Sequence, residues 1–190
     1  SVQSRWLMHA HLIQTESASM DERDWNDKPL NHGESIYLQD VKFTRRSMGH
    51  VLLISGEFSA GLAALAPTAN IAGLGEDIGS GDFAIRIGRD SILLNTTNAT
   101  RVIAGWHEDG YAVSYADDKY ALIEISGQGS EMLLAQGASI RFKSPSPSAA
   151  IQFAGQNCLL VREAENWLLF VERPMLTFIC GFLASSNSTI

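Results

Sequence analysis

Three groups of residues in this sequence have types and spacings that could do chemistry. His9 and His11 would lie on one side of an extended segment, which is half of a metal site, but no further ligand stands at a fixed distance from them. His107 precedes Glu108 and Asp109, where an imidazole beside carboxylates could act as a general acid or base. Turn formation explains this polar stretch better.

The third group is a glycine-rich stretch, residues 126–130 with the sequence SGQGS. Glycines at a helix start let backbone N–H groups approach a phosphate. Here Met132 stands where the third glycine of a dinucleotide fingerprint would be, and no Gly-Lys-Ser/Thr occurs. The stretch therefore favours an ordinary helix start, with Ser126 capping the first free N–H groups. We predict no catalytic, cofactor-binding or metal-binding residue in this chain.

The composition is that of a folded protein. Hydrophobic residues make up 45% of the 190 residues and charged residues 18%, enough apolar surface to offset chain entropy. The net charge is −7 and no basic block is present, so we expect no nucleic-acid partner. The longest apolar run, residues 175–184, is about half of the roughly 20 residues that span a bilayer. Without the apolar core of a signal peptide near the N-terminus, we expect a soluble, cytoplasmic protein with no membrane partner.

Two local features bear on structure and partners. Cys158 and Cys180 lie among apolar residues and form no Cys-x-x-Cys pair, which favours two buried thiols, with a single bridge between them as the alternative. Residues 51–119 hold nine acidic and four basic residues. This acidic middle is either a solvated face or a docking surface for a basic partner.

From Ile36 onward the sequence repeats. The run 51–65 has the layout of 121–135, with identical residues at a constant offset of 71. Segments 90–94 and 100–105 likewise parallel 165–169 and 176–181. The identical pairs are Ile54/Ile125, Ser55/Ser126, Gly56/Gly127, Ser59/Ser130 and Leu62/Leu133.

Each half is predicted to contain a strand, a short helix, a hairpin around a polar turn and a second helix. In the second half, strands are expected at 150–153, 158–161 and 167–171, and the first helix is expected to end at Gln136, with Gly137 as its C′ glycine. Pro174 suits the first turn of the last helix, where Leu176, Ile179 and Leu183 face the core. The predicted fold class is α+β, with duplicated β-α-β-β-α-like halves and helices packed on antiparallel sheets.

Residues 1–35 are polar and irregular and form a predicted N-terminal arm. The duplicated domain spans 36–185, with halves of about 36–110 and 111–185, and 186–190 form a tail. The arm carries Trp6 and Trp25, which a solvated tail would rarely hold because a tryptophan gains by burying its large surface. We predict that the arm packs either on this chain or on another protein, with Trp6 and Trp25 as candidate partner-interface residues.

The second half carries a family resemblance. Residues 111–114, the run ALIEISGQGSEMLLAQG at 121–137, residues 142–152 and residues 165–173 resemble the gamma subunit of heterotetrameric sarcosine oxidases. That family is similar to the folate-binding domain of the glycine-cleavage T-protein, and the resemblance covers most of residues 50–184. Family members commonly have a Gly-Pro-Asp-Glu-Trp turn where this chain has GRDSI at 88–92, so its first half is divergent.

The resemblance implies a subunit that binds no cofactor itself. Alpha, beta and delta subunits would carry FAD, FMN, NAD, tetrahydrofolate and zinc. It implies a non-catalytic, gamma-type subunit of a flavin-dependent oxidase or dehydrogenase acting on sarcosine or another secondary or N-methyl amine, with a structural and assembly role. The alternative is a free-standing tetrahydrofolate-binding protein or one-carbon transferase of the T-protein fold. A subunit should expose a larger apolar patch than an ordinary monomer.

Overall fold

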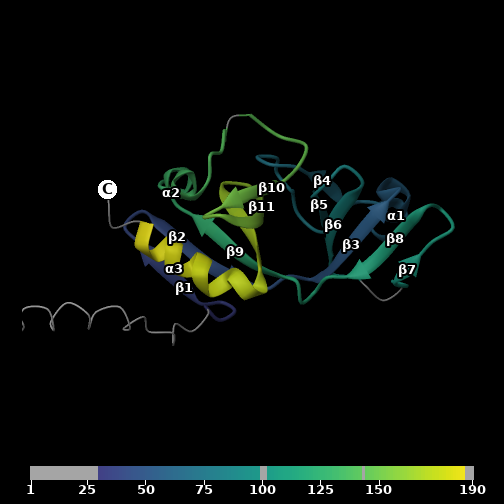
Figure 1. The fold of residues 1–190 in the computed structure, drawn as a ribbon, viewed down its shortest axis with the longest axis horizontal. Coiled ribbons are helices and arrows are strands. Elements are labelled where there is room, and N and C mark those ends of the chain that lie inside the picture. The colour runs from purple at the N-terminus through teal and green to yellow at the C-terminus, as the bar shows by residue number, and fades with distance from the viewer. Residues whose placement is uncertain (1–29, 99–101, 143, 187–190) are drawn as a thin grey trace, which may run out of the picture.

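The computed structural model describes residues 30–98, 102–142 and 144–186. These residues form two six-stranded sheets and three α-helices (Figure 1). In chain order the elements are β1 (Ser35–Leu38), β2 (Val41–Arg46), β3 (His50–Gly56), α1 (Phe58–Leu65), β4 (Asn70–Ala72), β5 (Phe83–Arg86), β6 (Ser91–Thr96), β7 (Gly105–Trp106), β8 (Tyr111–Tyr115), β9 (Tyr120–Ser126), α2 (Ser130–Gly137), β10 (Ala150–Phe153), β11 (Gln156–Glu163), β12 (Asn166–Glu172) and α3 (Leu176–Ser186), with a 3-10 turn at Arg173–Met175 before α3.

The strands are shared between the sheets in an interleaved way. Sheet A has the order β1-β2-β9-β12-β11-β10, and sheet B has the order β4-β5-β6-β3-β8-β7. Every pairing is antiparallel except that of β4 with β5. The chain passes from sheet A to sheet B between β2 and β3 and returns between β8 and β9 (Figure 1). The two crossings bring residues far apart in the sequence side by side.

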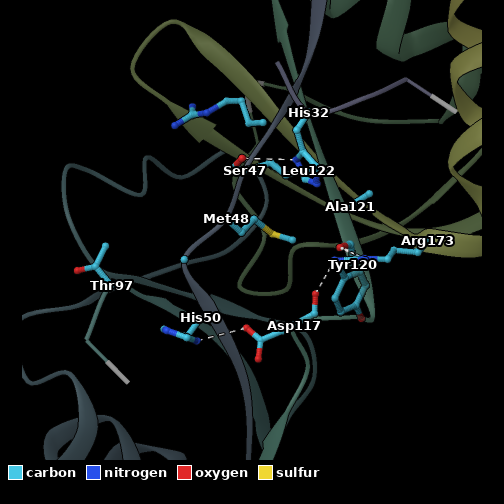
Figure 2. Close-up of a pocket in the computed structure, with 12 residues that line it drawn as sticks. His32, Ser47, Met48, His50, Thr97, Asp117, Tyr120, Ala121, Leu122 and Arg173 are labelled. Carbon is cyan, nitrogen blue, oxygen red and sulfur yellow. Dashed lines mark hydrogen bonds and ion pairs between the residues drawn. The ribbon is translucent and has the colours of Figure 1, made fainter. Parts of the chain in front are cut away.

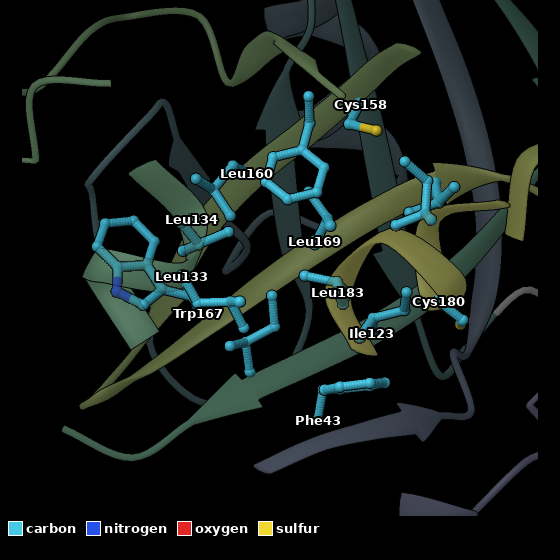
Figure 3. Close-up of a cluster of buried hydrophobic side chains, with 14 of the residues drawn as sticks. Phe43, Ile123, Leu133, Leu134, Cys158, Leu160, Trp167, Leu169, Cys180 and Leu183 are labelled. Atoms are coloured by element: carbon cyan, nitrogen blue, oxygen red, sulfur yellow. The ribbon is translucent and has the colours of Figure 1, made fainter. Parts of the chain in front are cut away.

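Buried side chains form one cluster on each face of sheet A. The cluster under α2 and α3 includes Phe43, Leu134, Trp167 and Leu183 (Figure 3). All five residues of 167–171 are buried and apolar, because helices cover one face of the strand and sheet B covers the other. Leaving such a run exposed on either face would cost about 1.5–3 kcal/mol for each large side chain.

The second cluster joins the two sheets. It combines Val51 and Phe83 of sheet B with Leu122 and Phe170 of sheet A. The rings of Phe83 and Phe170 meet edge to face with centroids 6.4 Å apart, a favourable aromatic geometry. A third cluster packs α1 against the opposite face of sheet B. The order of layers is therefore helices, sheet A, sheet B and helix.

The α+β class and most elements of the second half are confirmed. β10, β11 and β12 cover the predicted strands, and α2 ends at Gly137, one residue beyond the predicted end. Leu176, Ile179 and Leu183 are buried on the core side of α3. Both cysteines are buried free thiols, as predicted. Within the described ranges, no helix is long and apolar enough to cross a membrane.

Two local predictions are wrong. Ser126 does not cap α2: its hydroxyl donates to the carbonyl oxygen of Lys42 at 3.3 Å, and Gly129 is the N-cap residue. The reason is that β9 pairs with β2 through Ser126, which moves the helix start forward. In the second helix expected in the first half, residues 102–104 lie in a loop and Gly105 begins β7, while residues 99–101 are outside the described residues. Pairing of Gly105 with Val113 extends sheet B where the helix was expected.

Candidate functional site

A cavity of about 630 Å³ lies where the chain crosses between the sheets (Figure 2). Residues 47–50 of the first crossing form one wall, and Asp117 and Tyr120 of the second crossing form another. The lining also includes His32, Arg46, Thr97, Ala121, Leu122 and Arg173. Cationic and imidazole groups thus outnumber carboxylates at this site. Whether each group could bind a ligand depends on the contacts that it already makes within the chain.

Asp117 holds the two crossings together. Its Oδ1 accepts a hydrogen bond from the backbone N–H of Val51 at 2.8 Å, and the N–H of Ala116 donates to the carbonyl of Val51 at 2.8 Å. His50 Nδ1 lies 3.8 Å from the same carboxylate (Figure 2), with both side chains about half exposed. An exposed pair at this distance contributes little to stability. The carboxylate is therefore chiefly a backbone acceptor.

Arg46 is engaged by two carboxylates. Its Nη1 donates to Glu124 Oε2 at 2.9 Å and also to the carboxylate of Glu163. The hydrogen bond that Arg46 donates to Glu163 is the main cause that raises the pKa of Arg46. This pairing links β2, β9 and β11 across sheet A. Because its charge is already matched, the guanidinium is poorly suited to capture an anionic ligand.

Arg173 binds the second crossing through carbonyl groups. Its Nη2 donates to the carbonyl of Asp117 at 3.0 Å and its Nε to that of Tyr120 at 3.3 Å. Its Nη1 lies 3.4 Å from Asp118 Oδ1. Its backbone N–H also donates to the carbonyl of Lys119, at 3.0 Å. These contacts fix the strand entry into β9.

His32 and Ser47 form a second polar pair in the cavity, besides His50 and Asp117. Ser47 Oγ lies 3.5 Å from His32 Nδ1 (Figure 2), and Arg45 Nη2 lies 3.4 Å from His32 Nε2. Both contacts are at the upper limit of hydrogen-bond length and join exposed side chains. Contacts this long do not hold the Ser47 hydroxyl firmly against the imidazole. The arrangement does not activate a nucleophile.

The histidine beside two carboxylates has a structural role. The ring of His107 stacks on Tyr111 with centroids 4.5 Å apart, and its Nε2 lies 2.9 Å from the carbonyl oxygen of Ile103. Glu108 and Asp109 are exposed in the turn that the Gly110 N–H closes onto the His107 carbonyl at 3.0 Å. The turn interpretation is confirmed.

The glycine-rich stretch serves close packing. A Cβ on Gly127 would lie 2.1 Å from the carbonyl oxygen of Asp40, and a Cβ on Gly129 would lie 2.7 Å from the Asp40 carboxylate. The space beside the α2 helix start is thus filled by an acidic side chain, which would repel a phosphate. Helix-start geometry is the correct interpretation of residues 126–130.

The other predicted residues divide into those outside the described ranges and those the structure places. Trp6, Trp25, His9 and His11 lie outside the described residues. In the part of the chain that is described, no group of three or more His, Cys, Asp or Glu residues could hold a metal ion. Sequence reasoning missed the tethering role of Asp117, because its partner stands 66 residues earlier.

Comparison with known proteins shows what fold this is. No protein-family model matches the sequence, and no curated protein matches it. Among solved structures, it is similar to a chain of the heterotetrameric sarcosine oxidase from Corynebacterium sp. U-96, solved in complex with pyrrole 2-carboxylate. The TM-score is 0.60 at 16% identity, and the match covers 82% of this chain and 88% of that chain. The resemblance to this family is confirmed at the level of the fold.

Proposed function

We propose that this chain is a non-catalytic, gamma-type subunit of a flavin-dependent heterotetrameric complex that oxidises sarcosine or another secondary or N-methyl amine. Its role in that complex is structural. FAD, FMN, NAD, tetrahydrofolate and zinc would be held by alpha, beta and delta partner subunits. The observation that carries the proposal is the fold shared with a chain of a heterotetrameric sarcosine oxidase over most of both chains.

The extent of the match supports a subunit of this fold. The similarity covers 82% of this chain and 88% of the other, so the shared fold extends over most of both chains.

The partners of the cavity residues support an assembly role. Arg46 is matched by two carboxylates, and Asp117 and Arg173 bind backbone groups of the crossings. These contacts stabilise the backbone conformation of the two crossings, and they leave the polar groups engaged within the chain. A rigid structure suits a subunit that binds partners, because it loses little conformational entropy on binding.

We further infer that the chain arose by internal duplication. The order β1-β2-β9-β12-β11-β10 of sheet A corresponds, strand by strand, to β7-β8-β3-β6-β5-β4 of sheet B. Gly127 and Gly56 occupy matching places: a Cβ there would lie 2.1 Å from the Asp40 carbonyl oxygen and 2.5 Å from that of Gly110, respectively. In this arrangement the first half contributes the β1-β2 hairpin to sheet A, and the second half contributes β8 to sheet B, so the halves exchange strands.

Affinity purification of the tagged chain from its native host at low salt tests the proposal. The masses of the co-purifying chains and the visible absorbance of the eluate are recorded. We expect a yellow complex with a large dinucleotide-binding chain that is reduced by a secondary amine. A colourless protein with the mass of one chain would contradict the proposal.

The alternative of a tetrahydrofolate-binding protein is tested separately. Tetrahydrofolate is titrated into the isolated chain by calorimetry, with the Arg173→Ala variant as a control for binding in the cavity. We expect no heat of binding in either protein. One-to-one micromolar binding that the variant weakens would favour the alternative.

A further inference from the structure

Sheet B ends in an edge with large exposed apolar side chains. Ile103 is 72% exposed, Trp106 73% and Tyr115 57%, and we call these three residues the β7 edge patch. β7 is the last strand of sheet B, and its described pairing is with β8 alone. An exposed tryptophan beside an exposed isoleucine is unusual on a monomer surface and is typical of an interface.

The β7 edge patch is held in place by its own hairpin. The Tyr115 hydroxyl donates to the carbonyl of Val102 at 3.1 Å, and His107 Nε2 lies 2.9 Å from the carbonyl oxygen of Ile103. The ring of His107 is in turn stacked on Tyr111, which is buried in the cluster under α1. A surface ordered in advance loses little conformational entropy when it binds.

The backbone of β7 is open toward solvent. The N–H of His107 donates to the carbonyl of Tyr111 at 2.8 Å, and Trp106 is paired with Ala112. In an antiparallel pair, residues alternate between facing the partner strand and facing away. The N–H and C=O of Trp106 therefore point away from β8, where another strand could pair with them.

The edge strand β7 and its hairpin carry no lysine, no arginine and no proline. Natural edge strands are commonly guarded by charged side chains, above all lysine, or by proline. Residues 102–115 contain no lysine, arginine or proline. The edge is instead flanked by carboxylates, which favour pairing with a strand that carries basic side chains.

The carboxylates lie at the turn next to Trp106. Glu108 and Asp109 are exposed there, and the Glu57 side chain lies within 3.3 Å of the position that a Cβ on Gly110 would take. None of these three carboxylates forms an ion pair with another described residue. Their charges are thus available to a cationic partner.

We propose that the β7 edge patch binds an extended segment of a partner subunit that carries lysine or arginine and pairs with β7 as an added strand. The partner's apolar side chains would pack on Trp106 and Ile103, and its basic side chains would meet Glu108 and Asp109. The identity of the partner as a subunit of the amine-oxidising complex rests on the proposed function. A second copy of this chain fits less well, since residues 51–119 carry nine acidic and four basic residues and would repel their counterparts.

Site-specific photo-cross-linking in the purified complex tests this contact. The photoreactive residue benzoylphenylalanine replaces Trp106, and in a matched control it replaces Tyr37. Tyr37 is also 73% exposed on the edge strand of sheet A, but Lys42 Nζ lies 5.3 Å from its ring centroid. We expect position 106 to cross-link to a lysine- or arginine-bearing peptide of another subunit, and position 37 to give less of that product.

Affinity measurements with the partner subunit recovered from the complex provide the second readout. We expect Trp106→Ser to raise the dissociation constant at least about tenfold. The double variant Glu108→Lys/Asp109→Lys should weaken binding at low salt and flatten its salt dependence. Glu131→Lys, an exposed charge reversal on α2, is the control and should have little effect. Thermal melting of each variant checks that the fold is retained.

The outcomes separate this inference from the proposed function. A flavin-containing complex whose cross-links from position 106 reach no partner peptide, or reach another copy of this chain, would overturn the inference and leave the proposed function standing. A basic partner peptide found in a complex without flavin would support the docking surface and contradict the proposed function. Unchanged affinity of Trp106→Ser for the partner would also overturn the inference.

Discussion

Asp117 and Val51 stand 66 residues apart in the sequence and meet where the chain crosses between the two sheets, with the Asp117 carboxylate accepting the Val51 N–H at 2.8 Å. One residue follows β8 and the other lies in β3, so this bond joins the two crossings, together with the bond from the Ala116 N–H to the Val51 carbonyl. The same crossings form the cavity and set the strand order of both sheets. The bond therefore holds together the two segments through which the chain passes between sheet A and sheet B.

Removing the Asp117 acceptor should destabilise the protein. We expect Asp117→Ala to lower the free energy of unfolding by about 1–3 kcal/mol, because the buried N–H of Val51 loses its partner. Asp117→Asn keeps an oxygen that can accept the bond and should cost much less. Urea unfolding followed by circular dichroism measures both, and equal losses would show that the negative charge matters instead.

Gly127 should not tolerate a side chain. Its φ is +108°, and an added Cβ would lie 2.1 Å from the backbone carbonyl oxygen of Asp40. Gly155 also has a positive φ, +76°, but nothing lies within 4 Å of its Cβ position. We expect Gly155→Ala to cost about 1–3 kcal/mol from backbone strain alone and Gly127→Ala to cost distinctly more. Similar losses in thermal melting would contradict the close packing at Gly127.

Asp82 should make stability depend on acid pH. Burial by itself raises the pKa of this carboxyl, but hydrogen bonds from Thr96 and Thr97 outweigh it and lower the pKa below its ordinary value. The folded state then binds fewer protons than the unfolded state near about pH 4, so this stabilisation is present above that pH and is lost as the pH falls.

The matched variant for this effect is Asp82→Asn. Wild type should lose more stability than the variant between about pH 5 and pH 3, as measured by urea unfolding at each pH. Parallel pH profiles would show that the bonds from Thr96, at 2.6 Å, and Thr97 do not favour the charged form.

Cys158 should affect stability at alkaline pH. Burial, with a smaller contribution from the charge of Glu172, raises the pKa of its thiol to about 12. Above about pH 9 the unfolded chain releases this proton while the folded chain keeps it, so stability falls as the pH rises toward 12. The stability difference between wild type and Cys158→Ala should therefore shrink from about pH 8 to about pH 10.5. A constant difference would place the thiol in contact with solvent.

The sequence predicted best where local patterns decide the structure. The strands of 150–171 and the helical spacing of Leu176, Ile179 and Leu183 follow from side-chain periodicity and short polar turns. The end of α2, to within one residue, and the turn at His107 were also predicted, because turn and helix-end residues act locally.

Features that depend on pairing between strands far apart in the sequence could not be predicted. Ser126 has the right type and place to cap α2, yet its pairing opposite Lys42 keeps it in β9. Nothing in a single sequence shows that β2 pairs with β9 and β8 with β3, so the crossings and the cavity between them could not be predicted. Trp106 was equally hidden, because the exposure of a tryptophan on an edge strand depends on what covers that edge.

The central claim is that this chain supports an amine-oxidising complex without taking part in its chemistry. The most direct measurement co-expresses the co-purifying subunits with and without this chain and determines both the yield of assembled complex and the kcat for a secondary amine per bound flavin. We predict that omitting the chain lowers the yield of complex, while kcat per flavin in the complex that still forms stays the same. An unchanged yield with a loss of kcat per flavin would contradict the claim and place a catalytic group in this chain.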